Sequence, residues 1–361
     1  MKKCHLIMQL CLVKSFFLSA LVALPINPCH GLDKEPIAAS SPLQSILYTW
    51  PREYLEYVGN RTRLSTCTGV IWVGDNKLIS IGAHNHSLDT YQFDPTIPSL
   101  FAYKNENLND FQKTPIGQLE NIAVSKDGSL AAVSNNGASS IHLYKIVNTE
   151  FVHIAEIPKV GWWNHGTRFS RQMDYIAYTI FGNPGKIMLF RIMENNDEIN
   201  ITLSQDMDTN LFPLHPKGID FSLDDRFIVV CHAINNSRAP NRLSGALAVY
   251  SFDRINGKID PTPISVIGTS ELLCVPEDVC FSPDGSSVLV TNHGNDTITI
   301  HAFDPITGQL GESGILLQNP EAQLSFPHGL NVSPDGKYLA VANYGDDTVK
   351  IYSLSKLKDE R

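Results

Sequence analysis

Five ionisable side chains occupy the same place in successive repeats of this sequence, five residues before a turn that recurs along the chain. They are Glu120, His165, Lys217, Glu277 and His328. A glutamate or histidine can take a proton from water, and an ammonium group can stabilise the negative charge that develops when water attacks an ester or lactone. We therefore predict catalytic roles for Glu277, His328 and His165, and substrate-binding roles for Lys217 and Glu120.

A second group of polar residues lies closer to the same turn. Arg168, Asp220 and Asn331 stand two residues before it, and His232 ends a predicted strand in the fourth repeat. An arginine can bind a carboxylate or phosphate through two parallel hydrogen bonds. We predict that these four residues also contact a substrate. The competing interpretation is that polar side chains gather at both positions only because this part of the fold is wet.

Carboxylate and imidazole side chains from neighbouring repeats raise the question of a metal site. Glu277 and His328 form one such pair, and Glu120 and His165 form another. Mixed oxygen and nitrogen donors suit Zn²⁺ or Mn²⁺, although the ammonium group of Lys217 opposes a cation. The sequence requires no cofactor and leaves a divalent metal as an option, so we assign no metal ligand.

Several function classes are disfavoured by motifs that the sequence lacks. It contains no G-x-S-x-G, H-E-x-x-H, P-loop or dinucleotide fingerprint, which argues against serine-hydrolase elbows, zincins and nucleotide enzymes. The formal net charge is −9, and no basic stripe occurs along the chain. Nucleic-acid binding needs such a stripe, so we expect no nucleic-acid partner.

The recurring turn belongs to a long repeat that organises the whole chain. Each copy contains a short apolar strand, the turn, a second strand and a third, β-branched strand. Repeats of this kind predict an all-β fold, a single β-propeller of four-stranded blades. Six copies favour six blades, with seven as the alternative. The turns open at Val73, Ser125, Ser170, Ser222, Ser282 and Ser333, at intervals of 52, 45, 52, 60 and 51 residues.

The repeat also predicts which face of its first strand is buried. The residues one and three positions before the turn are mostly apolar, as in Ile122, Val279 and Leu330, and should pack between blades. The residues two and four positions before it should face the central channel, because side chains alternate along a strand. The last repeat leaves no residues for its fourth strand, so we expect an N-terminal strand, at 45–50 or 54–58, to close the ring.

The first 31 residues have the pattern of a secretory signal peptide. Lysines accompany an apolar run at residues 15–24, and acidic residues begin only after Gly31. Ten apolar residues are too few to span a bilayer, which favours cleavage near Gly31 over an uncleaved membrane tether. We expect a propeller domain at 32–361 in a periplasmic or secreted protein whose only membrane contact is the signal segment. Its cysteines allow three disulfide pairings, which stay open: Cys67, Cys231, Cys274 and Cys280.

Two motifs near the C-terminus carry a resemblance to known proteins. VLVTNHGNDTITI at 288–300 and LAVANYGDDTVKI at 339–351 resemble the YVTN repeats of bacterial exported propellers. The frame from PHG to SPDGKYLAVAN resembles the lactonase-type propellers, which include 6-phosphogluconolactonase-like and gluconolactonase-like proteins. The resemblance implies a propeller that hydrolyses a lactone. Lactonase propellers usually have seven blades, however, and the repeat count here is six.

Two functions are compatible with these observations. The first is hydrolysis of a small-molecule lactone or similar ester by a monomeric enzyme, at the mouth of the channel. The alternative is a non-enzymatic YVTN-type propeller that binds a protein, peptide or glycan in the cell envelope. An exported location fits poorly with 6-phosphogluconate, whose metabolism is cytoplasmic, and this weakens that substrate more than lactones in general.

Overall fold

The computed structural model describes residues 66–354 except for a few short segments. Those segments are 84–85, 95–98, 108–116, 149, 158–162, 183, 196–197, 212–213, 235–244, 269, 271 and 321. The predicted signal peptide and both candidate closing strands therefore lie outside the described residues. Within the described part, no helix is long and apolar enough to cross a membrane.

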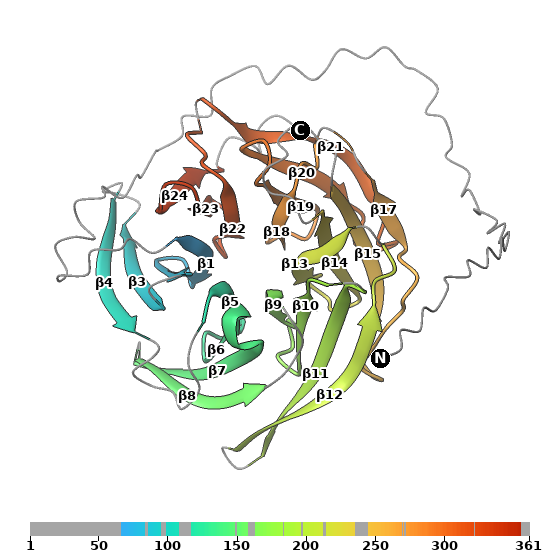
Figure 1. Cartoon of the computed structure of the whole chain (residues 1–361), viewed down its shortest axis with the longest axis horizontal. Coiled ribbons are helices and arrows are strands. Elements are labelled where there is room, and N and C mark those ends of the chain that lie inside the picture. The colour runs from blue at the N-terminus through green and yellow to red at the C-terminus, as the bar shows by residue number, and fades with distance from the viewer. Residues whose placement is uncertain are drawn as a thin grey trace, which may run out of the picture. The chain divides into compact units, whose positions relative to one another are not determined.

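The described residues form six antiparallel sheets arranged in a ring (Figure 1). One short 3₁₀ turn, η2 (Asn136–Ala138), lies between two strands of the second sheet. The strands of the first three sheets are β1 (Cys67–Val73), β2 (Lys77–Gly82), β3 (Ser87–Asp94), β4 (Ser99–Asn107), β5 (Leu119–Val124), β6 (Leu130–Asn135), β7 (Ser140–Val147), β8 (Glu150–Ile157), β9 (Asn164–Phe169), β10 (Tyr175–Ile180), β11 (Lys186–Asn195) and β12 (Glu198–Asp208). Those of the last three are β13 (His215–Phe221), β14 (Phe227–Ala233), β15 (Gly245–Asp253), β16 (Lys258–Ile259), β17 (Ser265–Ile267), β18 (Pro276–Phe281), β19 (Ser287–Asn292), β20 (Thr297–Phe303), β21 (Leu310–Gln318), β22 (Pro327–Val332), β23 (Tyr338–Asn343) and β24 (Thr348–Ser353).

Each sheet is one blade, and its strands pair in the order in which they occur along the chain. The blades that begin with β1, β5, β9 and β18 have four strands each. In the fourth blade the outer position is divided between β16 and β17, which both pair with β15. The sixth blade shows three strands, β22 to β24, in the described residues. The six-bladed propeller predicted from the repeats is therefore confirmed.

The innermost strand of each blade contacts the innermost strands of both neighbours (Figure 1). The series runs from β1 through β5, β9, β13, β18 and β22 and returns to β1. Two hydrogen bonds join the first and last blades: the amide of Trp72 donates to Asn331 Oδ1 at 3.0 Å, and His328 Nδ1 donates to the carbonyl of Thr68 at 2.9 Å. The centre of the ring is thus closed by described residues alone.

Six clusters of buried apolar side chains lie between neighbouring blades. The residue three positions before the turn belongs to these clusters: Ile122 is 1% exposed, and Ile219, Val279 and Leu330 are 0% exposed. Burial of a side chain of this size stabilises a fold by about 1.5–3 kcal/mol. The prediction that this face of the first strand packs between blades is confirmed.

Side-chain hydrogen bonds fix the turns at both ends of the second strand. In the fifth blade, Ser282 Oγ donates to Asp284 Oδ1 at 2.6 Å. Gly285 follows with a φ of +71°, a conformation that glycine adopts without strain. At the opposite end, a repeated asparagine accepts a hydrogen bond from a loop amide, which gives it a structural role. These asparagines are Asn135, Asn292 and Asn343.

The four cysteines of the propeller domain are all free. Cys67, Cys231, Cys274 and Cys280 are buried, and none forms a disulfide. Burial raises the pKa of each thiol, so that the unreactive protonated form dominates. The sequence left three disulfide pairings open, and the structure contains none of them.

The protein should lose stability as the pH falls from about 7 to about 4.5, because several histidines are buried in the neutral form. His301 is the simplest case: it is 0% exposed, its Nδ1 lies 2.7 Å from Ser313 Oγ, and burial lowers its pKa from 6.5 to about 4. Between these two pKa values the unfolded chain binds a proton that the folded chain does not bind, so acid favours unfolding. This residue alone should contribute a loss of about 2 kcal/mol.

Urea unfolding of the wild type and of His301→Gln at the two pH values measures this contribution. Acidification should cost the variant about 2 kcal/mol less than it costs the wild type, whatever the variant's stability at neutral pH. Equal losses in both proteins would show that folding leaves the pKa of His301 unchanged, contrary to this prediction.

Candidate functional site

An irregularity in each innermost strand turns the predicted catalytic residues toward the channel. Strict alternation would place the residue five positions before the turn on the packing face, together with positions one and three. The pairing with the second strand instead shifts register here, as between Leu119 and Asn121 in β5 and between Pro276 and Val279 in β18. The same shift occurs in β1, β9, β13 and β22. Such a β-bulge re-aims a side chain, and here it brings one side chain per blade to the channel mouth.

Hydroxyl groups on the second strands attach these bulges to the next blade. Thr291 Oγ1 accepts a hydrogen bond from the amide of Asp278 in its own blade at 2.9 Å. It also donates to the carbonyl of His328 in the next blade at 2.6 Å. The site residues are therefore positioned through their backbones. Equivalent hydroxyls in two other blades are those of Ser134 and Thr179, which donate to the carbonyls of His165 and Lys217.

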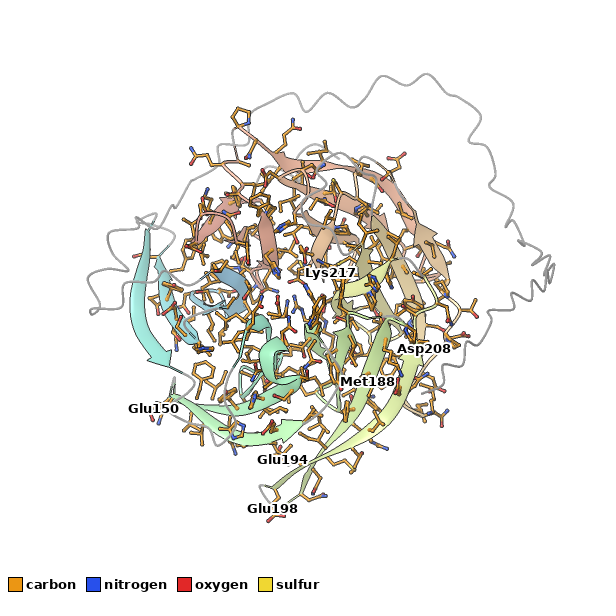
Figure 2. All side chains as sticks on the ribbon, in the orientation of Figure 1. Glu150, Met188, Glu194, Glu198, Asp208 and Lys217 are labelled. Atoms are coloured by element: carbon orange, nitrogen blue, oxygen red, sulfur yellow. The ribbon has the colours of Figure 1, made fainter. Side chains whose placement is uncertain are left out.

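Five of the predicted residues lie together at one end of the channel. We call Glu120, His165, Lys217, Glu277 and His328 the mouth cluster; each is buried, with 3–8% of its surface exposed. Glu277 is central, and its Oε1 accepts a hydrogen bond from Lys217 Nζ. Its Oε2 lies 3.1 Å from Nε2 of His165 and 3.7 Å from Nε2 of His328. Figure 2 shows Lys217 near the middle of the ring, whereas the other labelled residues lie further out.

His328 is held in a single tautomer. Because a carbonyl oxygen only accepts, the 2.9 Å contact with the carbonyl of Thr68 places the hydrogen on Nδ1 and leaves a lone pair on Nε2. Burial lowers the pKa of His328 to about 3, so the ring is neutral. Nε2 faces Oε2 of Glu120 at 3.6 Å. The ring also stacks on that of His165, with centroids 5.4 Å apart and an interplanar angle of 12°.

The two carboxylates of the mouth cluster have different surroundings. Oε1 of Glu120 accepts hydrogen bonds from Gln118 and Asn136 at 2.8 and 2.9 Å, yet burial dominates and raises its pKa. Burial also opposes ionisation of Glu277, but the ammonium group of Lys217 and the two imidazoles outweigh it, and the pKa of Glu277 lies well below its ordinary value. Two carboxylates with pKa values shifted in opposite directions are a common feature of acid–base sites.

Part of the mouth cluster also has the donor atoms of a metal site. Glu120, His165 and His328 each offer one atom within 4.8 Å of the other two, and no other described residues form such a group of three. The sequence suggested separate pairs from neighbouring blades. The structure places three of those residues in one group.

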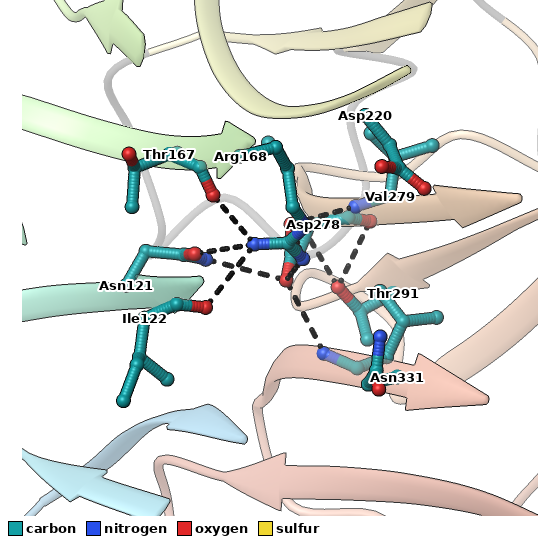
Figure 3. Close-up of polar contacts among 12 residues, drawn as sticks. Asn121, Ile122, Thr167, Arg168, Asp220, Asp278, Val279, Thr291 and Asn331 are labelled. Atoms are coloured by element: carbon teal, nitrogen blue, oxygen red, sulfur yellow. Dashed lines mark hydrogen bonds and ion pairs between the residues drawn. The ribbon is translucent and has the colours of Figure 1, made fainter. Parts of the chain in front are cut away.

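Arg168 lies deeper in the channel, in a buried network with three other blades (Figure 3). Its Nη2 lies 3.0 Å from Asp278 Oδ2, and its Nη1 donates to Asn121 Oδ1 at 2.6 Å. Asp278 Oδ2 in turn accepts from the amide of Leu330 at 3.3 Å. Protein groups therefore surround the guanidinium, and its contact with a substrate stays a prediction.

Asn121 and Asp278 are functional-region residues that the sequence reasoning missed. Both stand four positions before the turn. The strands approach so closely at this position that a Cβ added to Gly218 would lie 2.5 Å from the Cα of Asp278. The sequence does distinguish these two residues, because the same position is a glycine in the other four repeats. The glycines in the other four blades are Gly69, Gly166, Gly218 and Gly329.

The three other predicted substrate contacts also lie outside the mouth cluster. Asp220 binds Arg171 Nη2 at 2.9 Å and a backbone amide of the next blade at 2.9 Å. Asn331 binds the amide of Trp72. His232 is 0% exposed, neither ring nitrogen has a hydrogen-bond partner among the described residues, and burial lowers its pKa to about 3. These contacts give Asp220 and Asn331 a structural role, and a role in substrate binding remains a prediction for all three residues.

Two cavities lie toward opposite ends of the innermost strands. One of about 550 Å³ is lined by Gln118 and Asn136, which bind a mouth-cluster carboxylate, and by Trp163, which is 48% exposed. The other, of about 700 Å³, is on the side of the turns and is lined in part by Arg168 and Asp220. Both volumes are in the range of small-molecule sites. The first cavity adjoins the mouth cluster, so we treat that end as the candidate active site.

Known families provide a comparison for the C-terminal third of the chain. Residues 241–360 match the family described as "Lactonase, 7-bladed beta-propeller". The resemblance to lactonase-type propellers is confirmed. The matched range includes Glu277 and His328 of the mouth cluster. No curated protein matches the sequence.

Solved structures extend the likeness in fold to most of the chain. A putative 6-phosphogluconolactonase from Bacteroides uniformis aligns with a TM-score of 0.57 and 17% identity, over 82% of this chain and 84% of that one. A similar protein from Bacteroides fragilis gives 0.52 and 17%, over 79% of both chains. A functionally unknown protein from Desulfotomaculum acetoxidans gives 0.55 and 15%, over 80% and 83%. At these identities the likeness establishes the fold.

The number of blades separates this protein from the matched family. The family is described as seven-bladed, whereas six sheets form the ring here. One blade fewer changes which strands face one another across the channel, so the contacts within this chain define its site.

Proposed function

We propose that this protein hydrolyses a lactone or a similar small cyclic ester at the mouth cluster. The position of Glu277 carries the proposal: one oxygen binds Lys217, and the other faces His165 and His328 without a well-directed hydrogen bond among the described residues. A buried ionised carboxylate of this kind can orient a water molecule and take its proton. The likeness to lactonase-type propellers supports the same class of reaction.

In the proposed reaction, water held by Oε2 of Glu277 attacks the carbonyl carbon of the lactone. Glu277 takes one proton of that water, and the ammonium group of Lys217 stabilises the charge on the carbonyl oxygen. The ring C–O bond then breaks, and the leaving alkoxide receives the proton from Glu277. The product is an open-chain hydroxy acid, and the carboxylate of Glu277 is regenerated. The stacked rings of His165 and His328 limit the positions that water and substrate can take.

The surroundings of the mouth cluster suggest the size and kind of substrate. A cavity of about 550 Å³ suits a small molecule, and the exposed ring of Trp163 offers a face on which a sugar ring can stack. The signal-peptide pattern favours export. We therefore propose an unphosphorylated lactone outside the cytoplasm as the substrate.

A titration assay at constant pH tests the activity, because each hydrolysed lactone releases one acid group. Purified protein should consume at least one member of a panel of gluconolactones and acyl lactones faster than spontaneous hydrolysis, at a rate proportional to protein concentration. Heat-denatured protein provides the background. Rates equal to that background for every lactone would contradict the proposal and favour a propeller that binds a protein, peptide or glycan.

A further inference from the structure

One imidazole nitrogen and two carboxylate oxygens converge in the mouth cluster. Nδ1 of His328 donates to the carbonyl of Thr68, and Nε2 is the ring nitrogen that faces the two carboxylates. It faces Oε2 of Glu120 at 3.6 Å and Oε2 of Glu277 at 3.7 Å. A cation placed between two carboxylate oxygens and an imidazole nitrogen at these distances would be attracted by all three atoms.

The charges of the cluster point the same way. Two carboxylates, Glu120 and Glu277, are buried beside one ammonium group, that of Lys217, which binds the far oxygen of Glu277. Buried charges are normally paired or bound to a metal. Among the described residues, no lysine or arginine forms an ion pair with Glu120: its Oε1 accepts hydrogen bonds from two amides, and its Oε2 lies 3.6 Å from the imidazole of His328.

We propose that Glu120, His165 and His328 bind a divalent transition-metal ion, with Zn²⁺ as the best match. Their donor atoms lie within 4.8 Å of one another. Bonds of about 2.0–2.1 Å in a tetrahedron place ligand atoms about 3.4 Å apart, so small side-chain movements complete the site. Three protein ligands would leave a fourth position for water or substrate, and Oε2 of Glu277 lies 3.1 and 3.7 Å from the Nε2 atoms of His165 and His328.

The supporting residues around these ligands have the form expected of a metal site. Ligating histidines usually donate their second ring hydrogen to a carbonyl or carboxylate, as His328 does to Thr68. Ligating carboxylates are usually hydrogen-bonded at the other oxygen, as Glu120 is by Gln118 and Asn136. Nitrogen donors favour Zn²⁺ over Mg²⁺ or Ca²⁺, which prefer oxygen ligands.

Calorimetric titration of chelator-treated protein with ZnCl₂ measures the binding directly, independently of any hydrolysis. We expect one ion per chain, and Co²⁺ should give the visible absorption of a tetrahedral complex. Glu120→Gln keeps the hydrogen bonds of Oε1 and removes the charged ligand, and should weaken binding by about 100-fold or more. Glu312→Gln makes the same chemical change at an exposed site and should bind like the wild type.

Each outcome decides for or against the site. Loss of binding in Glu120→Gln, with retention in Glu312→Gln, supports it. No binding by the wild type, or equal binding by the wild type and Glu120→Gln, overturns it, because the ion would then be absent or bound elsewhere. A His328→Gln variant repeats the test if Glu120→Gln fails to fold. Since the readout is binding, a failed lactone assay leaves this result intact.

Discussion

Replacement of Glu277 by glutamine is expected to lower kcat for lactone hydrolysis by about 100- to 10,000-fold, the range that general-base catalysis contributes. Glutamine has nearly the same shape and still offers an oxygen to Lys217, but it cannot take a proton from water. The pKa of Glu277 lies well below its ordinary value, so the wild-type residue is the ionised form that the reaction needs. KM should change much less than kcat, because the residue transfers protons in the chemical step and is not proposed to bind the substrate before it.

The measurement is a comparison of steady-state kinetics for the two proteins on the lactone that the wild type hydrolyses fastest. Glu277→Asp provides a second test, since it keeps the charge near Lys217 but withdraws the oxygens from the two imidazoles. It should also lose most of its activity. Glu312→Gln, an exposed change of the same type, should leave kcat unaltered. A kcat for Glu277→Gln within about threefold of the wild type, in a folded protein, would exclude Glu277 as the base.

The architecture was predictable because it depends on patterns that repeat. Apolar residues at positions such as Ile122 and Val279 recur every 45 to 60 residues and lie in clusters between blades. Six recurrences need six blades, and the structure contains six sheets. The same repetition identified the position that carries Glu120, His165 and the other members of the mouth cluster.

The depth and the partners of individual side chains could not be predicted in this way. Whether a residue faces the mouth or the interior depends on the β-bulge, and a bulge is a local register shift without a fixed sequence signature. The pairing of Arg168 with Asp278 joins the third and fifth blades. The two residues are 110 positions apart in the chain. No local pattern connects such residues. The sequence therefore predicts that Arg168 binds a substrate anion, whereas in the structure its guanidinium pairs with the carboxylate of Asp278.

Replacement of Arg168 by methionine is expected to lower the free energy of unfolding by about 3–5 kcal/mol, the usual effect of breaking a buried ion pair. Asp278 is 1% exposed and would be left without its cationic partner. Asn121 would also lose the donor to its Oδ1, so β5, β9 and β18 would be joined less firmly at the channel (Figure 3).

Urea unfolding at neutral pH checks the prediction, with Arg254→Met as the matched control. Arg254 forms an ion pair with Asp174 in which the two side chains are 42% and 27% exposed, and its loss should cost only about 0–1 kcal/mol. The double variant Arg168→Met, Asp278→Asn also removes the unpaired carboxylate charge of Asp278 and should recover part of the stability. It serves as a second test if the single variant does not fold. If Arg168 served only to bind a substrate, Arg168→Met would be no less stable than Arg254→Met. That result would return Arg168 to the group of substrate contacts, because a guanidinium that the fold does not need is free to bind one.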